Sequence, residues 1–424
     1  MVVTISPQLR PAEHTWRVLL GVLIVGVLIR AGIIFGLGTA WRPEAFEYDE
    51  LARNLLAGQG YTIQHLGTTY RSFHSALPYT LLTAGVYALV PGGQVALLLL
   101  QSVFSGLLGF VVFGIARIVL SEHVGVLSAV LVVLHPALAY YDTHKLHPLS
   151  FDALVVAFAT YALLSLSGSP SVSRSLLVGL ALGVAILQRG TMVLLVPLVG
   201  LSLFWYLRLH RKGWLACLAF GVGLVLVVAP WLARSYALYG YPLLMTTTAE
   251  HFWRGNVAHS SGGSYLPSGR TVLEDAPEEF RRDLLSRDEW GQYQLFLREG
   301  LLAVREAPVA FVGKLLRKFV YFWTFAPQTG LLYPPWQLYL YMAYYALIGG
   351  LAVIGARWVA RVIRNDLKAW RGFILLVAVW LCVSVGQSIF YVELRHRWAV
   401  EPLLLILTSI GWLSLTKRLG DKVT

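Results

Sequence analysis

Long apolar runs separated by short polar segments recur along the whole chain. Ten of these runs approach the length of about 20 residues that a helix needs to cross the hydrocarbon core of a bilayer. They cover residues 17–38, 94–118, 123–141, 149–167, 175–188, 190–207, 214–232, 336–356, 372–391 and 398–416. The pattern predicts an all-α polytopic membrane protein with ten to twelve spanning helices.

Two further runs, 76–91 and 309–327, are ambiguous. The first is short, and the second carries three basic residues near its middle, where charge in hydrocarbon is costly. If neither run crosses and both termini are cytoplasmic, the inner segments carry +11 and the outer segments +1 of the total charge of +12. This bias follows the positive-inside rule. We therefore predict that 309–327 is an interfacial helix on the outer leaflet.

Composition excludes a soluble or disordered chain. Of 424 residues, 57% are hydrophobic and 13% are charged, with a mean hydropathy of +0.65, whereas soluble domains carry about 25% charged residues. Cys217 and Cys382 lie within apolar runs, so we interpret them as small core residues. The first run lacks a small-residue cleavage site, so we expect no cleavable signal peptide. Because topology explains the net charge, no nucleic-acid partner is needed.

Polar residues gather in two outer segments, 39–75 and 233–308, and these divide the chain into three parts. We expect residues 1–232 to form a transmembrane module that includes the first outer loop, 233–308 a large outer loop, and 309–424 the interfacial helix with C-terminal spans. Within the large loop, 277–306 has helical periodicity. Its expected apolar side consists of Phe280, Leu284, Phe296, Leu297, Leu301 and Val304.

The first outer loop has four carboxylates within seven residues: Glu44, Glu47, Asp49 and Glu50. Acids that begin a helix are one explanation, since they favour the helix dipole. A general base at the boundary between water and lipid is the other. The spacing alone favours the first, because structural acids outnumber catalytic ones.

The run from Glu44 through Tyr48, Ala52 and Gly58-Gln-Gly60-Tyr61 resembles the first outer loop of GT-C fold glycosyltransferases. It is most similar to bacterial relatives of protein O-mannosyltransferases and of the lipid A aminoarabinose transferase. Further matching segments follow in order: His135-Pro136 to Tyr141, Leu187 to Gly190, Pro230 to Gly240, Phe252 to Asn256, Glu306 to Pro308, and Arg395 to Pro402.

The resemblance implies an enzyme that moves a sugar from a polyprenyl-phosphate donor to a lipid, glycan or protein acceptor. The reaction would take place on the outer side of the cell inner membrane, with an acid of the first outer loop as the base. Four positions before Tyr48 that acid is Glu44, where the family usually has Asp. Asp49 is the second candidate. Displacement of a catalytic group by about 1 Å can cost much rate, so an active enzyme and an inactive chain both remain open.

A phosphate leaving group calls for arginine or lysine. The candidate donor or phosphate contacts are Lys145, Arg189, Arg395, Arg397, Arg71, His74 and Tyr48. For most such cations a lipid headgroup contact is the simpler explanation. Arg189 is the exception, because an unpaired charge between apolar runs is expensive. The segments around Arg71 and after Tyr141 depart from the family pattern.

Asp142, His144 and His147 offer metal ligands, but they lack a thiolate or a regular ligand spacing. We expect no cofactor, and leave a divalent metal open. One alternative function is an inactive membrane subunit of this fold that acts as a scaffold for protein partners. A lipid or glycan transporter ranks last, because transporters place polar groups near the midplane of the membrane, whereas here they gather at one face.

Overall fold

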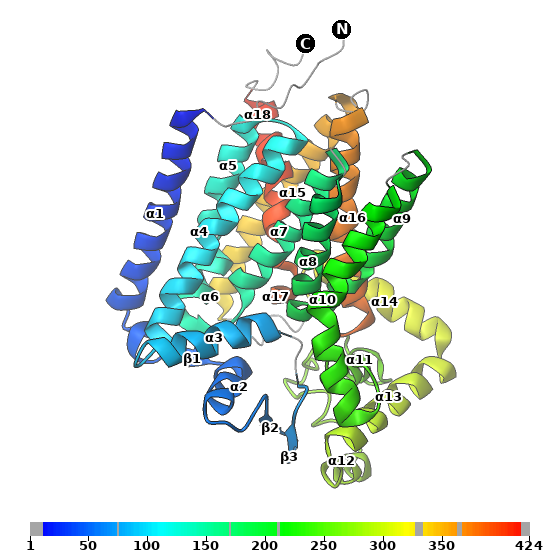
Figure 1. Ribbon diagram of the computed structural model, residues 1–424. Helices are drawn as coiled ribbons and strands as arrows, with labels where there is room; N and C mark the ends of the chain where they lie inside the picture. The colour runs from blue at the N-terminus through cyan, green and yellow to red at the C-terminus, as the bar shows by residue number, and fades with distance from the viewer. Residues whose placement is uncertain are drawn as a thin grey trace.

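The structure, a computed structural model, describes residues 12–73, 76–168, 171–209, 213–326, 334–362 and 367–416. A bundle of long helices carries a smaller unit of helices and short strands at one end (Figure 1). The bundle contains α1 (Glu13–Gly36), α4 (Gln94–Val119), α5 (Glu122–Val133), α6 (Pro136–His144), α7 (Leu149–Gly168), α8 (Val172–Gln188), α9 (Leu195–Leu209), α10 (Gly213–Tyr239), α15 (Pro335–Val362), α16 (Leu367–Ile389) and α18 (Glu401–Leu415).

The remaining elements lie at or near the end of the bundle where the smaller unit sits. They are η1 (Thr39–Trp41), β1 (Glu44–Ala45), α2 (Glu47–Leu56), β2 (Ile63–His65), β3 (Thr68–Tyr70), α3 (Leu77–Leu89), β4 (Lys145–Leu146), η2 (Gly190–Leu194), α11 (Thr247–Asn256), α12 (Glu278–Leu285), α13 (Glu289–Glu306), α14 (Pro308–Trp323) and α17 (Leu394–Arg397).

Six helices within the described residues are long and apolar enough to cross a membrane: α1, α4, α7, α10, α15 and α16. A seventh span is the pair α5 and α6, which is bent by 42°. The bend falls just before Pro136, whose ring cannot continue the preceding helix. The helices α8, η2 with α9, and α18 are apolar but shorter. These elements coincide with the ten predicted runs, so the all-α polytopic fold is confirmed, while the number of crossings stays a prediction.

The two ambiguous runs form α3 and α14. In Figure 1, α3 lies across the end of the bundle and α14 projects from its side. One side of α14 is exposed and apolar: Val309, Val312, Leu316 and Val320. On the other side, the Lys318 ammonium is buried and donates to Asn256 Oδ1 at 2.7 Å. The position of α14 relative to the membrane stays a prediction.

The start of α1 and the end of α18 lie at the same end of the bundle, opposite α2, α11, α12 and α13 (Figure 1). This arrangement agrees with the prediction that the two termini share one side of the membrane. It also places the first outer loop and the large outer loop together. The helix α10 runs to Tyr239, past the predicted end at 232, and so reaches into the smaller unit, which we call the outer unit (Figure 1).

The outer unit has its own apolar core. The predicted helical region 277–306 forms two helices, α12 and α13, instead of one. Phe280 and Phe296 pack against Trp253 of α11, with ring centroids 5.2 Å from the indole in both cases. Leu301, predicted to lie on the apolar side, is 53% exposed. The unit is joined to the bundle by a short parallel pairing of β1 with β4, in which Glu44 lies opposite Lys145.

Candidate active site

A cavity of about 390 Å³ lies where the bundle meets the outer unit. Its walls come from the start of α2 and α7, the ends of α8 and α16, η2, α11 and the segment that contains α17. Cavities of this size suit small ligands or part of a larger one. The charged and imidazole side chains among its lining residues are Glu47, Asp152, Arg189, Arg395, His147, His251 and His396.

Two carboxylates line the cavity from different elements. Glu47 is the first residue of α2, and Asp152 lies in the first turn of α7. Both therefore stand at helix N-termini, where the partial positive charge of the helix stabilises an anion. Asp152 also accepts a hydrogen bond from Gln188 Nε2 at 2.5 Å and lies 3.7 Å from Arg189 Nη1.

Two arginines face these acids. Arg189 follows the end of α8, and its Nη2 donates to the carbonyl of His396 at 2.9 Å and to Gln387 Oε1 at 3.3 Å. Its buried Nε has no partner among the described residues. Arg395 lies 2.9 Å from Glu393. The cavity thus holds fixed guanidinium groups, which bind phosphate oxygens well.

The surroundings of the His396 ring favour its neutral form. Burial is the main cause, and the charges of Arg395 and Arg189 add to it, so that the pKa of His396 is well below its ordinary value. Its Nδ1 accepts the backbone N–H of Glu393 at 3.0 Å. The proton of the neutral ring therefore resides on Nε2, which makes this atom a hydrogen-bond donor.

The two acids predicted as the base do not line the cavity. Glu44 lies 2.9 Å from Lys145 Nζ, and its side chain is 55% exposed. Asp49 accepts from Arg53 at 2.8 Å and from Tyr87 at 2.5 Å. Burial would raise the pKa of Asp49, but these hydrogen bonds outweigh it and hold the pKa below its ordinary value. Asp49 comes two positions after Glu47 in α2, so its side chain lies on the opposite side of the helix from Glu47.

Three of the predicted phosphate or donor contacts do line the cavity: Arg189, Arg395 and Tyr48. Lys145 does not; besides Glu44 it contacts the rings of Phe46, Tyr140 and Tyr141 at 5.1 to 5.8 Å. Arg71 lines a separate groove on the outer unit. His74 lies outside the described residues.

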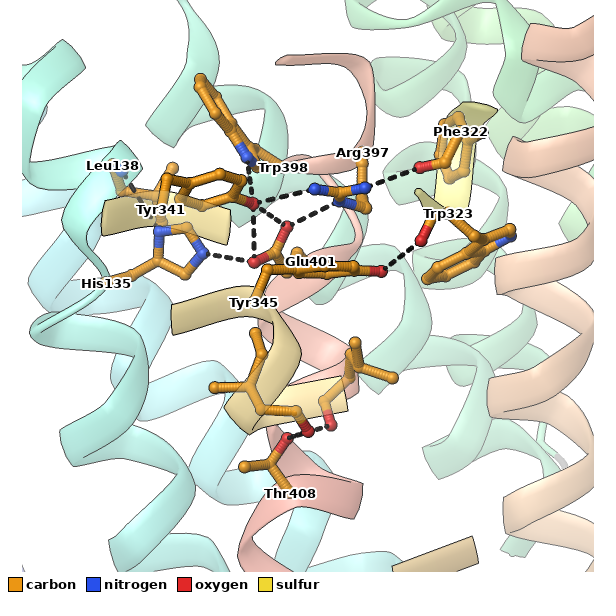
Figure 2. A network of polar contacts seen from close by, with 12 residues as sticks. His135, Leu138, Phe322, Trp323, Tyr341, Tyr345, Arg397, Trp398, Glu401 and Thr408 are labelled. Carbon is orange, nitrogen blue, oxygen red and sulfur yellow. Dashed lines mark hydrogen bonds and ion pairs between the residues drawn. The ribbon is translucent and has the colours of Figure 1, made fainter. Parts of the chain in front are cut away.

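Arg397, another predicted phosphate contact, does not line the cavity. Figure 2 shows it in a buried network in which Nε donates to Glu401 at 3.1 Å and Nη2 to the Tyr341 hydroxyl at 3.2 Å. Nη1 donates to the carbonyls of Phe322 and Thr324. The side chain is fully buried, and the guanidinium carbon lies 3.7 Å from the centre of the Tyr345 ring. Its donors are thus used inside the protein.

The same network includes a histidine of the first module. His135 Nδ1 accepts the N–H of Leu138, so Nε2 carries the proton and donates to Glu401 Oε1 at 3.1 Å (Figure 2). The network therefore ties α6 to α15 and to the segment of α17 and α18. Arg395 and His396 of that segment face the cavity, while Arg397 anchors it from behind.

Asp142 and His144, two of the three residues considered as metal ligands, contact different partners. Asp142 binds Arg30 at 3.0 Å and Ser105 at 2.5 Å, whereas the ring of His144 stacks on Tyr140. Among the described residues, no three His, Cys, Asp or Glu side chains come together as metal ligands would.

Sequence reasoning did not name Glu47, Asp152, His251 or His396 as site residues. Glu47 was visible as one of the clustered acids of the first outer loop. Asp152 had a usable signal as well, because it is an acid within the predicted span 149–167, where a carboxylate calls for a partner. Its partner Arg189 carries the same signal in the sequence, because a charge between apolar runs also needs a partner.

Residues 75–233 match the family model of dolichyl-phosphate-mannose-protein mannosyltransferases. No curated protein sequence matches the chain significantly. The structure is similar to the oligosaccharyltransferase of Archaeoglobus fulgidus in its apo form, with 12% identity and a TM-score of 0.57 over 96% of this chain. The oligosaccharyltransferase AglB from Archaeoglobus fulgidus, in complex with an inhibitory peptide and a dolichol-phosphate, has 12% identity and a TM-score of 0.53 over 96% of this chain.

The chain spans about half the length of these archaeal proteins, since it covers 51% of each. ArnT from Cupriavidus metallidurans bound to undecaprenyl phosphate is 16% identical over 96% of this chain and 80% of its own, but its TM-score of 0.44 is too low to support an argument. The family match and the archaeal structures agree with the motifs in the sequence. The chain therefore has the GT-C fold of membrane glycosyltransferases.

Proposed function

We propose that this protein is an integral membrane glycosyltransferase that takes a sugar from a polyprenyl-phosphate donor. The observation that carries the proposal is the cavity, where two carboxylates, Glu47 and Asp152, face two arginines, Arg189 and Arg395. Sugar transfer from a lipid phosphate needs a base for the acceptor and cations for the leaving phosphate. The cavity offers both at the end of a bundle of apolar helices.

We assign the base to Glu47 in place of Glu44. In the proposed step, Glu47 takes the proton of an acceptor hydroxyl while the acceptor oxygen attacks the anomeric carbon of the sugar. The bond between that carbon and the phosphate oxygen breaks, and its electron pair stays on the phosphate. Asp152 lines the same cavity and is the second candidate for the base.

Arg189 and Arg395 are assigned to the phosphate. Arg189 is held by the His396 carbonyl and by Asp152, so little side-chain entropy is lost when it binds a ligand. The dolichol-phosphate bound by the archaeal relative supports a lipid-phosphate ligand of this kind. We further propose that the cavity faces outward from the cell inner membrane, where the acceptor is a lipid, a glycan or a protein.

The pool of lipid-linked sugar in cells tests this proposal. Deleting the gene should make a polyprenyl-phosphate sugar accumulate, as measured by liquid chromatography and mass spectrometry of extracted lipids. The wild type should clear the pool, whereas Glu47→Gln should clear it about 10²- to 10⁴-fold more slowly, which is the usual contribution of a general base.

Glu44→Gln is the matched control, because Glu44 belongs to the same loop and lies outside the cavity. It should clear the pool like the wild type, at equal amounts of protein on immunoblots. If Glu47→Gln clears the pool normally and Glu44→Gln does not, the base is Glu44. If deletion leaves the pool unchanged, the scaffold function becomes the better account.

A further inference from the structure

The outer unit contains a second hollow, a groove of about 580 Å³ that shares no lining residue with the candidate active site. It lies between α2, the loop that follows α2, the hairpin of β2 and β3, and the end of α10. Its lining includes Glu50 and Asn54 of α2 and two arginines, Arg71 and Arg234. Glu47 and Glu50 lie one turn apart on α2, and Glu47 lines the main cavity whereas Glu50 lines the groove.

The walls of the groove are held in place without a ligand. Gln64 of the hairpin donates its backbone N–H to Glu50 Oε1 at 3.1 Å, and Asn54 Nδ2 donates to the Thr62 carbonyl at 2.7 Å. The hairpin is also fixed from outside, because the Tyr70 hydroxyl donates to Gln292 of α13 at 2.6 Å. A rigid wall reduces the entropy cost of binding.

Arg234 is fixed as well. Its guanidinium lies 5.0 Å from the Trp231 ring and 5.9 Å from the Tyr61 ring, and it donates to Ser72 Oγ at 3.2 Å. Arg71 is exposed and close enough for the two positive charges to act on each other. Glu50 in the wall, and Glu289 behind it, offset these charges, so the groove is close to neutral.

The lining is therefore polar without a strong net charge. It combines a carboxylate, two guanidinium groups, hydroxyls and the side-chain amides of Asn54, Gln59 and Gln64. A carboxylate offers two acceptor oxygens, a guanidinium group offers several donors, and a side-chain amide offers both a donor and an acceptor. Neighbouring hydroxyls of a sugar ring present the same mixture. A lipid tail would need an apolar floor, and Glu50 offsets part of the positive charge that would hold a bare anion.

We propose that this groove binds a saccharide, separately from the sugar that reacts in the main cavity. The assignment of that saccharide to the acceptor rests on the proposed glycosyl transfer, whereas binding itself does not. Binding of the acceptor in this groove, away from the reacting carbon, would supply binding energy. That energy can orient the acceptor for the reaction.

A glycan array tests the proposal with the full-length protein in lipid nanodiscs. The array carries a broad panel of neutral and acidic glycans, together with acidic peptides as a different ligand class. The test variant is Gln59→Ala/Arg71→Ala, since both residues are exposed in the groove wall. The matched control is Arg282→Ala/Gln294→Ala, which removes the same residue types from the exposed faces of α12 and α13.

The wild type and the control should retain the same glycans, and the test variant should lose the signal about tenfold, the scale of one lost charged hydrogen bond. Glu50→Gln, which keeps an oxygen for the N–H of Gln64, should also weaken binding. Glu47→Gln should bind normally, so failure of catalysis and failure of the groove are distinguished. Retention of no glycan, equal retention by the groove variants, or preference for acidic peptides would overturn the proposal.

Discussion

Arg397 and Glu401 form an ion pair that is completely buried among the helices. Removing two charges from water is expensive, and such a pair persists only when its remaining polar atoms are also bonded. Here Glu401 accepts from His135 and Tyr341 as well, and Arg397 reaches the carbonyls that end α14 (Figure 2). The pair therefore fixes the position of the segment that carries Arg395 and His396.

Replacing Arg397 with methionine should destabilise the protein by about 3–5 kcal/mol, because Glu401 is left buried with its charge unpaired. A denaturant titration in mild detergent, followed by tryptophan fluorescence, measures this. The double variant Arg397→Met/Glu401→Leu should recover part of the loss, since it removes both charges. Equal stability of the single and double variants would show that the pair has no such role.

The clustered acids show how a small shift in register decides a role. Glu44, Glu47, Asp49 and Glu50 lie within seven residues, and α2 begins at Glu47. Because a helix turns by about 100° per residue, Asp49 points away from Glu47 and contacts Tyr87. Glu50 lies one turn after Glu47 and lines the groove, whereas Glu47 lines the main cavity. Glu44 precedes the helix and pairs with Lys145 across two short strands.

At the scale of the helices, close backbone contact holds two pairs together. Gly355 of α15 and Gly411 of α18 face each other, and a Cβ on Gly355 would lie 2.0 Å from the carbonyl oxygen of Leu407. Gly179 of α8 and Gly223 of α10 meet in the same way. Small residues allow such contact between membrane helices, where packing replaces the hydrophobic effect as the source of association.

Gly355→Ala should therefore destabilise the protein by about 1–3 kcal/mol, the usual cost of overpacking. The matched control is Gly349→Ala in the same helix, since a Cβ there meets nothing within 4 Å. The control should leave the midpoint of thermal unfolding unchanged or slightly raised. A similar midpoint for both variants would mean that α15 and α18 can separate at little cost.

The helices were predictable because apolar runs of this length have few other structures available in a membrane. The ends of the helices were less predictable. The predicted span 190–207 begins with a turn of 3₁₀ helix, and α10 continues past 232. The start of α2 mattered most, because the sequence pattern did not fix it and it decides which acid faces the cavity.

The residues of the site were only partly predictable. Arg189 stood out because a charge between apolar runs needs a partner, and that partner is Asp152 on the neighbouring helix α7. Arg395 and Arg397 have the same residue type and lie two positions apart, yet one lines the cavity and the other is anchored in the core. Only the packing of α14, α15 and α18 around this short segment separates their roles.

For the whole molecule, the orientation in the membrane is the feature that the proposed function needs. Arg361 lies near the end of α15, at the same end of the bundle as the start of α1, whereas α12 lies at the opposite end (Figure 1). The excess of basic residues in the segments assigned to the inner side predicts that the first end lies in the cytoplasm. The cavity and the groove would then both face outward.

Cysteine labelling in intact cells tests this orientation, with Cys217 and Cys382 first replaced by serine. A membrane-impermeant reagent added outside should label Arg282→Cys in α12 and should leave Arg361→Cys unlabelled until the membrane is permeabilised. Labelling of Arg361→Cys in intact cells would instead mean that 76–91 or 309–327 crosses the membrane.

Native mass spectrometry of the protein purified in mild detergent tests the central claim most directly. The account predicts a bound polyprenyl phosphate, with or without a sugar, whose added mass identifies the carrier and narrows the sugar. This lipid should be lost from Arg189→Ala/Arg395→Ala and kept by the control Lys145→Ala, which lies outside the cavity. Ordinary phospholipids without any isoprenoid phosphate, or equal retention by the double variant, would contradict the account.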